Sequence, residues 1–232
     1  LERHFRSHFV LYKPKDIVSG DFYWTKRIIN NDFNITILAT ADCTGHGVPG
    51  AMMSMLGIAL LNEIALKKEV KTANDILDKL REKVIESLQN QDSGMVTSDG
   101  MDIGLILYDH TNNKLHFTGA NRPLYLIREK ALTVLDGNKM PIGKHGISKG
   151  HFQNNIIELQ KNDTIYLFSD GYADQFGGPK NKKFKRQAFK DLLLKIQDET
   201  MQSQKQILEN EHKKWRNTNR QTDDILVIGI RF

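Results

Sequence analysis

The sequence predicts an α+β protein built mainly from antiparallel sheets. Three observations support this fold class: strand-like apolar runs fill the first forty residues, two amphipathic helical patterns follow, and a second group of strands then leads to two more helical patterns and a last strand. Strands that come in groups are typical of antiparallel sheets, whereas a parallel sheet alternates strand and helix. At 232 residues the chain can form one large domain, so we expect residues 1–232 to be a single domain.

The expected elements follow the periodicity of apolar residues along the chain. Alternating or continuous apolar runs predict strands, and apolar residues three and four apart predict helices. Pro49, which suits a first helical turn, marks the start of the first helix after the glycines Gly47 and Gly50. The predicted strands are 8–12, 17–27, 33–41, 101–108, 114–118, 123–128, 132–135, 156–159, 164–168 and 226–230, with a turn at residues 30–32; the predicted helices are 49–68, 72–89, 186–197 and 201–215.

Composition indicates a soluble globular protein of a reducing compartment. Hydrophobic residues make up 39% and charged residues 26% of the chain. We expect no membrane span, because no apolar run reaches about 18 residues, and no signal peptide at residues 1–6, which lack an apolar core. A single cysteine, Cys43, excludes an internal disulfide and favours the cytoplasm. The chain lacks an initiator methionine, which we interpret as the mark of a fragment of a longer protein.

The formal net charge of +5 is concentrated in one basic patch. Nucleic acid is a conceivable partner for such a patch. No recognised nucleic-acid motif accompanies it, so we expect a solvated loop and no nucleic-acid partner. The patch comprises Lys180, Lys182, Lys183, Lys185 and Arg186.

Four aspartates at the ends of apolar strand-like runs are the most informative feature of the chain. Asp21 follows Val18-Ser19-Gly20, Asp42 and Asp170 each close an apolar run, and Asp223 opens the last one. Carboxylates in such places are costly to desolvate unless a cation neutralises them. Several of them at one sheet edge would form an all-oxygen site for Mg²⁺ or Mn²⁺, a chemistry that suits phosphate substrates.

Residues Gly45 to Gly50 match the spacing G-x-G-x-x-G of dinucleotide-binding turns. That fold requires a following parallel strand that ends in an acid about 20 residues on. Here a long helical pattern follows and the acid, Asp42, precedes the glycines. We therefore reject the dinucleotide interpretation and expect the glycines to allow a tight backbone turn beside Asp42.

Five motifs in the same order resemble the metal-dependent serine/threonine phosphatases of the protein phosphatase 2C (PP2C) superfamily, and more narrowly its bacterial SpoIIE/RsbU branch. The resemblance covers residues 8–232 and implies a four-layer α-β-β-α sandwich of two mainly antiparallel sheets. It also implies that the domain is the C-terminal output of a longer sensor protein. The motifs are Pro14-x-x-x-Val18-x-Gly20-Asp21-Phe22-Tyr23, Ala41-Asp42-x-x-Gly45-His46-Gly47-x-x-Gly50-Ala51-Met52, Gly119-Ala120-Asn121-x-Pro123, Ser169-Asp170-Gly171 and Asp223-Asp224.

The resemblance implies a centre of two Mn²⁺ or Mg²⁺ ions. By this likeness Asp21 and Asp42 approach both ions, the carbonyl of Cys43 completes one ligand shell, and Asp170 and Asp223 supply the remaining ligands. Asp224 is adjacent and could be mistaken for the metal ligand, but the family pattern favours Asp223, the first residue of the pair. A weaker third ion at Asp99 or Asp102 is an open alternative.

The same resemblance implies hydrolysis of phosphoserine or phosphothreonine on a regulatory protein, such as an anti-sigma-factor antagonist. A hydroxide bridging the ions would attack phosphorus in line. His46 either contacts phosphate or only orients the glycine turn, and Cys43 is not expected to act as a nucleophile. The phosphate-binding arginine of the eukaryotic branch is not identified, with Lys13, Lys15 and Arg27 as nearby candidates.

Two rival functions stay open at this point. One is a non-catalytic binding or sensing module that retains the fold, and the other is a metal-dependent hydrolase of small phosphate esters. A homodimer could form through the N-terminal segment before His8, which we expect to be exposed.

Overall fold

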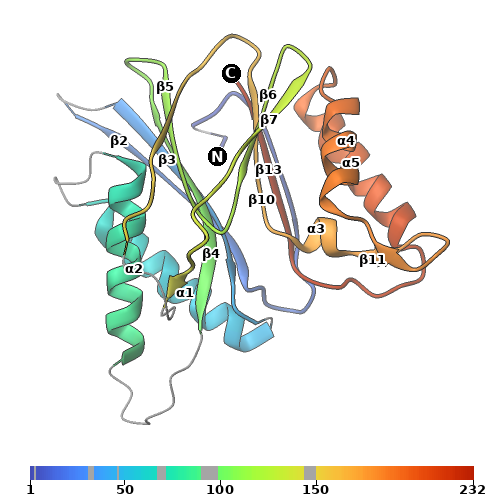
Figure 1. Cartoon of the computed structure of the whole chain (residues 1–232), viewed down its shortest axis with the longest axis horizontal. Helices are drawn as coiled ribbons and strands as arrows, with labels where there is room; N and C mark the ends of the chain where they lie inside the picture. Colours follow the sequence, from blue (N-terminus) through green and yellow to red (C-terminus); the bar gives the residue numbers. More distant parts are fainter. Residues whose placement is uncertain (3, 31–33, 46, 67–71, 90–98, 144–149) are drawn as a thin grey trace.

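Two antiparallel sheets lie face to face, and helices cover the outer face of each (Figure 1). The computed structural model describes residues 1–2, 4–30, 34–45, 47–66, 72–89, 99–143 and 150–232. This arrangement confirms the expected α-β-β-α sandwich. The two chain ends lie at the same end of the sandwich, because Ser7 at the start of the first strand pairs with Arg231 at the end of the last.

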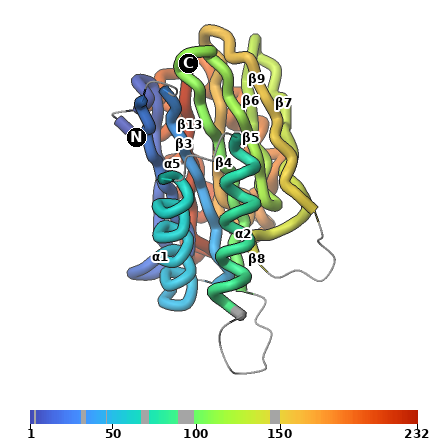
Figure 2. The backbone as a smooth tube through the Cα atoms, turned by 90° about the vertical axis from the view of Figure 1, so that its left-hand side faces the viewer, coloured from blue at the N-terminus to red at the C-terminus, as the bar shows by residue number. Residues whose placement is uncertain are grey.

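The first sheet has the strand order β2-β3-β4-β5-β9, with the short β8 paired to β4. Helices α1 and α2 lie side by side on its outer face (Figure 2). Their buried side chains pack against one face of the sheet in a cluster that includes Leu61, Leu77 and Leu105. The strands are β2 (Asp21–Ile29), β3 (Asn34–Cys43), β4 (Gly100–Asp109), β5 (Lys114–Ala120), β8 (Ile142–Gly143) and β9 (Asn155–Glu158), and the helices are α1 (Gly47–Ile64) and α2 (Ala73–Gln89).

The second sheet has the strand order β1-β13-β10-β6-β7. Helices α4 and α5 cover its outer face around Phe189 and Leu208. The short helix α3 (Gly171–Asp174) follows β10 and leads into a hairpin of β11 (Phe176–Gly177) and β12 (Lys182–Lys183). The remaining elements are β1 (Ser7–Lys13), β6 (Leu124–Arg128), β7 (Ala131–Leu135), β10 (Thr164–Phe168), β13 (Ile225–Arg231), α4 (Arg186–Lys195) and α5 (Met201–Arg216).

Alternation along the central strands decides which side chains meet between the sheets. Leu38 and Ile106 belong to the cluster between the sheets, whereas their neighbours Ile37 and Leu105 belong to the cluster under α1 and α2. Successive strand residues point to opposite faces, so residues an even number of positions from Leu38 also face the second sheet. Each buried aliphatic side chain stabilises the fold by about 1.5–3 kcal/mol, which fixes this register.

Several expected elements differ from the observed ones. The strand expected at 17–27 begins only at Asp21, because residues 14–20 form a loop, and Gly20 lies so close to the Gly45 carbonyl that a Cβ would be 2.7 Å from it. The first helix ends at Ile64 rather than at residue 68. The sequence missed α3, β8, β11 and β12, which are too short to show a periodic pattern. Much of the turn expected at 30–32 and of the loop expected at 91–99 lies outside the described residues.

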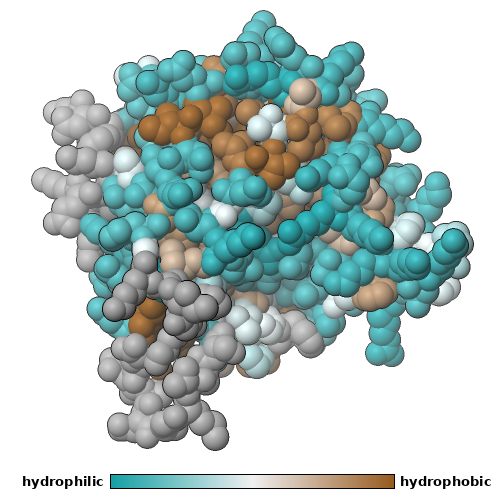
Figure 3. Space-filling model, viewed as in Figure 1, coloured by the Kyte–Doolittle hydropathy of each residue, from teal (hydrophilic) through white to brown (hydrophobic). Residues whose placement is uncertain are grey.

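The N-terminal segment is exposed only in part, because Glu2 and Arg6 are exposed whereas Phe5 is buried. Phe5 is 6% exposed and joins the cluster between the sheets, where its ring meets that of Phe232 edge to face at 6.0 Å between centroids. The segment therefore packs against the end of the sandwich. Most of the face in Figure 3 is hydrophilic, with an apolar band across its upper part.

Helix α1 is long and apolar enough to cross a membrane by length and composition, with 18 residues and a mean hydropathy of 1.3. This finding overturns the expectation that no segment meets that criterion. It is weak evidence of a membrane span, because core helices pass the same test. One face of α1 packs on the first sheet through Met53, Gly57 and Leu61, as a core helix does.

His212 should make the protein sensitive to mild acid. It lies buried in α5 with its ring centroid 5.4 Å from that of Tyr172, and neither ring nitrogen has a hydrogen-bond partner. Burial, aided by the positive charges of Lys13 and Arg216, lowers the pKa of His212 to about 4. As the pH falls below about 6.5, the unfolded chain binds the proton first, so stability is lost progressively down to about pH 4.

Urea denaturation gives the unfolding free energy of His212→Leu and of the wild type at each pH. We expect the difference between them, variant minus wild type, to be about 2 kcal/mol larger at pH 5 than at pH 7.5. Gln202→Leu, at an exposed and uncharged side chain of the same helix, serves as the control and should leave the pH dependence unchanged. A His212→Leu variant with the pH dependence of the wild type would contradict this account.

Candidate metal centre

Three aspartates form a row across neighbouring strands of the first sheet. Asp21 of β2 pairs with Asp42 of β3, and Asp42 pairs with Asp102 of β4. Directly opposed residues in antiparallel strands have Cβ atoms about 4.5–5.5 Å apart. Asp42 and Asp102 lie four residues from Leu38 and Ile106, so this cross-strand row faces the second sheet.

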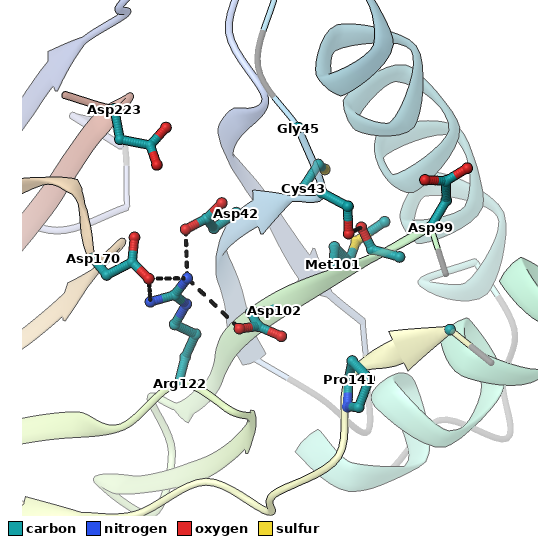
Figure 4. A pocket seen from close by; sticks show the side chains of 13 residues that line it. Asp42, Cys43, Gly45, Asp99, Met101, Asp102, Arg122, Pro141, Asp170 and Asp223 are labelled. Atoms are coloured by element: carbon teal, nitrogen blue, oxygen red, sulfur yellow. Dashed lines mark hydrogen bonds and ion pairs between the residues drawn. The ribbon is translucent and has the colours of Figure 1, made fainter. Parts of the chain in front are cut away.

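The second sheet brings two more aspartates to the same place. Asp170 follows β10 and begins α3, and Asp223 lies just before β13. Together with Asp42 and Asp102 they line a cavity of about 260 Å³ at this end of the sandwich (Figure 4). Carboxylates that are far apart in the sequence are thus gathered where the two sheets open.

The structure separates the roles of Asp223 and Asp224. The carboxylate of Asp224 is 3% exposed and accepts backbone N–H groups of Lys15 at 2.7 Å and of Gly20 at 2.8 Å. It therefore ties the loop before β2 to the second sheet. Asp223 lines the cavity, and its carboxylate points toward Asp42 and Asp170 (Figure 4). Of the pair, only Asp223 is placed to bind a ligand in the cavity.

An arginine that the sequence reasoning missed lies among the carboxylates. The guanidinium of Arg122 donates hydrogen bonds to Asp42 and to Asp170, the latter at 3.1 Å, and lies 3.6 Å from Asp102 (Figure 4). Its neighbour Asn121 donates to Asp102 at 2.8 Å. The motif Gly119-Ala120-Asn121-x-Pro123 contained the signal, a charged residue inside an apolar strand–turn–strand segment, but the motif left that position open.

Burial and repulsion between carboxylates disfavour ionisation of Asp21, Asp42 and Asp223. Burial, followed by the charge of Asp42, raises the pKa of Asp21 to about 9. Burial also raises the pKa of Asp42 to about 7, although the positive charge of Arg122 opposes the shift. Burial likewise raises the pKa of Asp223. A bound cation would relieve this cost.

The donor set fits hard divalent cations. Its ligands are carboxylate oxygens, which Mg²⁺ and Mn²⁺ prefer, and Oδ2 of Asp21 is buried without a hydrogen-bond partner. Within the residues that the structure describes, no three acidic, histidine or cysteine side chains are yet grouped closely enough to hold an ion. Three of the carboxylates are instead turned toward Arg122.

In the glycine turn after β3, the backbone of Gly50 packs against the backbone of Gly45, which lines the cavity. Gly45 has φ +83°, and a Cβ on Gly50 would lie 2.4 Å from the Gly45 carbonyl oxygen, so both positions require glycine. Cys43 lines the cavity at the end of β3. Burial raises the pKa of its thiol to about 12, so the side chain stays protonated and is not a nucleophile.

The remaining candidates from the sequence lie at different distances from the carboxylate cluster. Asp99 lines the cavity, but its carboxylate lies on the far side from Asp42 and points away from the cluster (Figure 4). Asp102 therefore is the better placed of the two candidates for a third ion, which stays a prediction. Arg27 lies toward the other end of β2 and donates to Asn34 at 3.1 Å. His46 lies outside the described residues.

Comparisons with known proteins agree with this architecture. The family model described as Stage II sporulation protein E (SpoIIE) matches residues 34–232. No curated protein matches the chain. The SiaA-PP2C domain of Pseudomonas aeruginosa is similar at a TM-score of 0.85 and 29% identity, over 97% of this chain and 85% of that one.

Two further solved structures share the fold at lower identity. A structure of the PP2C phosphatase domain of SpoIIE from Bacillus subtilis, with a fragment of its regulatory domain, has a TM-score of 0.75 and 18% identity, over 97% of this chain and 63% of that one. The serine/threonine phosphatase PstP/Ppp of Mycobacterium tuberculosis has a TM-score of 0.64 and 15% identity, over 97% of each chain. These matches support the PP2C fold.

The raised pKa of Asp21 predicts that this carboxyl destabilises the metal-free protein above about pH 4, because the folded protein keeps a proton that the unfolded chain releases. A carboxyl whose folded pKa is raised contributes stability below its unfolded pKa of about 4, which is lost as the pH rises toward about 9. Asp21→Asn should therefore exceed the wild type in unfolding free energy by at least about 2 kcal/mol at pH 8 in a chelator. Adding Mn²⁺ should reverse the order.

Thermal unfolding with and without Mn²⁺ measures both effects. Asp198→Asn, at a side chain that is 79% exposed, is the matched control and should change neither. If Asp21→Asn were less stable than the wild type at pH 8 without metal, the carboxyl of Asp21 would not destabilise the folded protein, and the prediction would be wrong.

Proposed function

The chain belongs to the SpoIIE family, and on this premise we propose that it is a metal-dependent phosphatase that hydrolyses phosphoserine or phosphothreonine on a regulatory protein. The observation that carries the proposal is the convergence of Asp42, Asp102, Asp170 and Asp223, from both sheets, on one cavity beside the buried Asp21. Carboxylates gathered at such cost are explained by the cations that they would bind.

The residues of the chain have distinct tasks in this function. Asp21, Asp42, Asp170 and Asp223, with the carbonyl of Cys43, would hold two Mn²⁺ or Mg²⁺ ions, and Asp102 a third. When bound, such ions polarise a phosphoryl oxygen and lower the pKa of water. Asn121 orients Asp102 by its hydrogen bond, and Asp224 fixes the loop that carries Gly20 and Asp21. The glycine turn keeps side chains out of the space below the cavity.

A phosphorylated protein fits the site better than a buried small ligand. The cavity is open to solvent and lies between the ends of the two sheets, so it can accept a phosphorylated side chain from a protein surface. An anti-sigma-factor antagonist is the substrate class that the resemblance suggests. We place the reaction in the cytoplasm because the only cysteine, Cys43, is a free thiol.

A non-catalytic module with the same fold is the main alternative. The raised pKa values of Asp21 and Asp42 argue against it, since a site without catalysis has no need to keep carboxylates that repel one another. A hydrolase of small phosphate esters is a second alternative. It predicts that an aryl phosphate is turned over as fast as a phosphoprotein.

Removal of metal and of one ligand tests the proposed centre. Activity on an aryl phosphate should vanish in EDTA and return with Mn²⁺ or Mg²⁺. Asp170→Asn should weaken metal binding and lower kcat by at least about 100-fold, because it removes one ligand charge while keeping the shape of the side chain. Activity assays and isothermal titration with Mn²⁺ measure the two effects.

The control is Asp174→Asn, in the same short helix at an exposed side chain that pairs with Lys183. It should retain metal binding and activity. Wild-type turnover in Asp170→Asn would overturn the assignment of the ligands. Absence of Mn²⁺ binding by folded wild-type protein would favour the non-catalytic module.

The hairpin of β11 and β12 should steer an acidic or phosphorylated protein toward the cavity. It follows Asp170 through the short helix α3, and Lys182 and Lys183 of β12 are exposed. Reversing the charges at Lys182, Lys183 and Lys185 should lower kcat/KM for a phosphoprotein by about tenfold and flatten its dependence on salt. Turnover of an aryl phosphate should not change.

Lys130→Glu with Lys161→Glu is the control, to be compared with the double reversal at Lys182 and Lys183, because both lysines are exposed and lie around the end of β6 away from the cavity. If the hairpin variant kept the kcat/KM and salt dependence of the wild type, the hairpin would have no steering role.

A further inference from the structure

Arg122 is built into the cavity by its backbone. It occupies the turn between β5 and β6, where a Cβ on Gly119 would lie 2.1 Å from the Arg122 carbonyl oxygen and a Cβ on Gly137 would lie 2.5 Å from it. Neither position can carry a side chain without moving this turn. The side chain therefore starts from a fixed point and reaches into the cavity (Figure 4).

The guanidinium is buried among acidic partners. Arg122 is 6% exposed and contacts Asp42, Asp102 and Asp170, while its Nε is buried without a hydrogen-bond partner. It is the one cationic side chain among the described residues that line the cavity. One positive charge thus faces three negative ones, and part of its hydrogen-bonding capacity is unused.

The same carboxylate oxygens cannot serve the guanidinium and metal ions equally. A divalent cation repels the guanidinium and attracts the carboxylates that hold it. In the described part of the chain, no three potential ligands are grouped around a common point while Arg122 holds them. Binding of metal ions to Asp42 and Asp170 must therefore loosen the contacts of Arg122.

We propose that Arg122 is a stored phosphate-binding residue: its guanidinium neutralises Asp42, Asp102 and Asp170 in the metal-free protein, is displaced by the metal ions, and then binds the phosphoryl group. A planar guanidinium donates paired hydrogen bonds to phosphate oxygens, which suits it to this second role. The inference rests on the proposed metal-dependent function. It adds a residue that couples metal binding to recognition of phosphate.

A purely structural role for Arg122 predicts a different outcome. If the guanidinium only held the cluster together, its removal would let the carboxylates separate, and affinity for metal would fall. The exchange predicts the opposite, because removal of the competing cation frees the ligands. Affinity for phosphate should fall in the metal-loaded protein, so the two affinities should change in opposite directions.

Isothermal titration on three proteins tests the exchange. Mn²⁺ is titrated into metal-free wild type, Arg122→Gln and Arg122→Lys, and inorganic phosphate is then titrated into each Mn²⁺-loaded protein. Arg122→Gln should bind Mn²⁺ about tenfold more tightly than the wild type and phosphate at least about tenfold more weakly. Arg122→Lys keeps the positive charge but lacks the planar, paired N–H donors of the guanidinium. It should therefore bind Mn²⁺ like the wild type and phosphate more weakly.

The outcomes separate this inference from the function on which it rests. Wild-type protein that binds no Mn²⁺ would overturn both. Wild-type protein that binds Mn²⁺, together with an Arg122→Gln variant of equal or lower Mn²⁺ affinity, would overturn the exchange alone. If Arg122→Gln does not fold, as judged by circular dichroism, the lysine variant decides, since wild-type affinity for phosphate in Arg122→Lys would also overturn the proposal.

Discussion

Repulsion between carboxylates is the constraint around which this end of the molecule is organised. Strand register places Asp21, Asp42 and Asp102 side by side on one face of a sheet, and the second sheet adds Asp170 and Asp223. Isolated charges in such a setting would be expelled into solvent or protonated. They stay together because the hydrophobic clusters on both faces of each sheet hold the strands in register. Burial of these apolar side chains therefore offsets the repulsion between the carboxylates.

Polar contacts around the cavity also hold the carboxylates and the loop that carries them in place. Asp224 uses both carboxylate oxygens to fix the loop before β2, Asn121 fixes Asp102, and Arg122 supplies the counter-charge. Each of these residues neighbours a residue of the site in sequence or in contact. The motifs that mark the family therefore contain both the ligand residues and the residues that position them, and the fold as a whole brings the separate motifs together.

The candidate site and the chain termini lie at opposite ends of the sandwich. The carboxylates and the basic hairpin lie where β3 ends and β13 begins, whereas both chain termini lie at the other end, with Phe5 packed against Phe232. A segment joined to the N-terminus would thus meet the domain at the end away from the cavity. Helix α1 starts at the glycine turn beside Asp42 and runs along the outer face of the first sheet.

The sequence by itself determined the fold class, nearly all of the long helices and strands, and four aspartates of the site, because apolar periodicity and charge within apolar runs are local signals. It could not find α3, β8 or the β11–β12 hairpin, whose few residues carry no period. Only the tertiary structure decided that Asp224 fixes the loop before β2, that Asp102 rather than Asp99 joins the cluster, and that Arg122 lies at its centre. These are facts of strand register and of approach between two sheets, which depend on residues far apart in the chain.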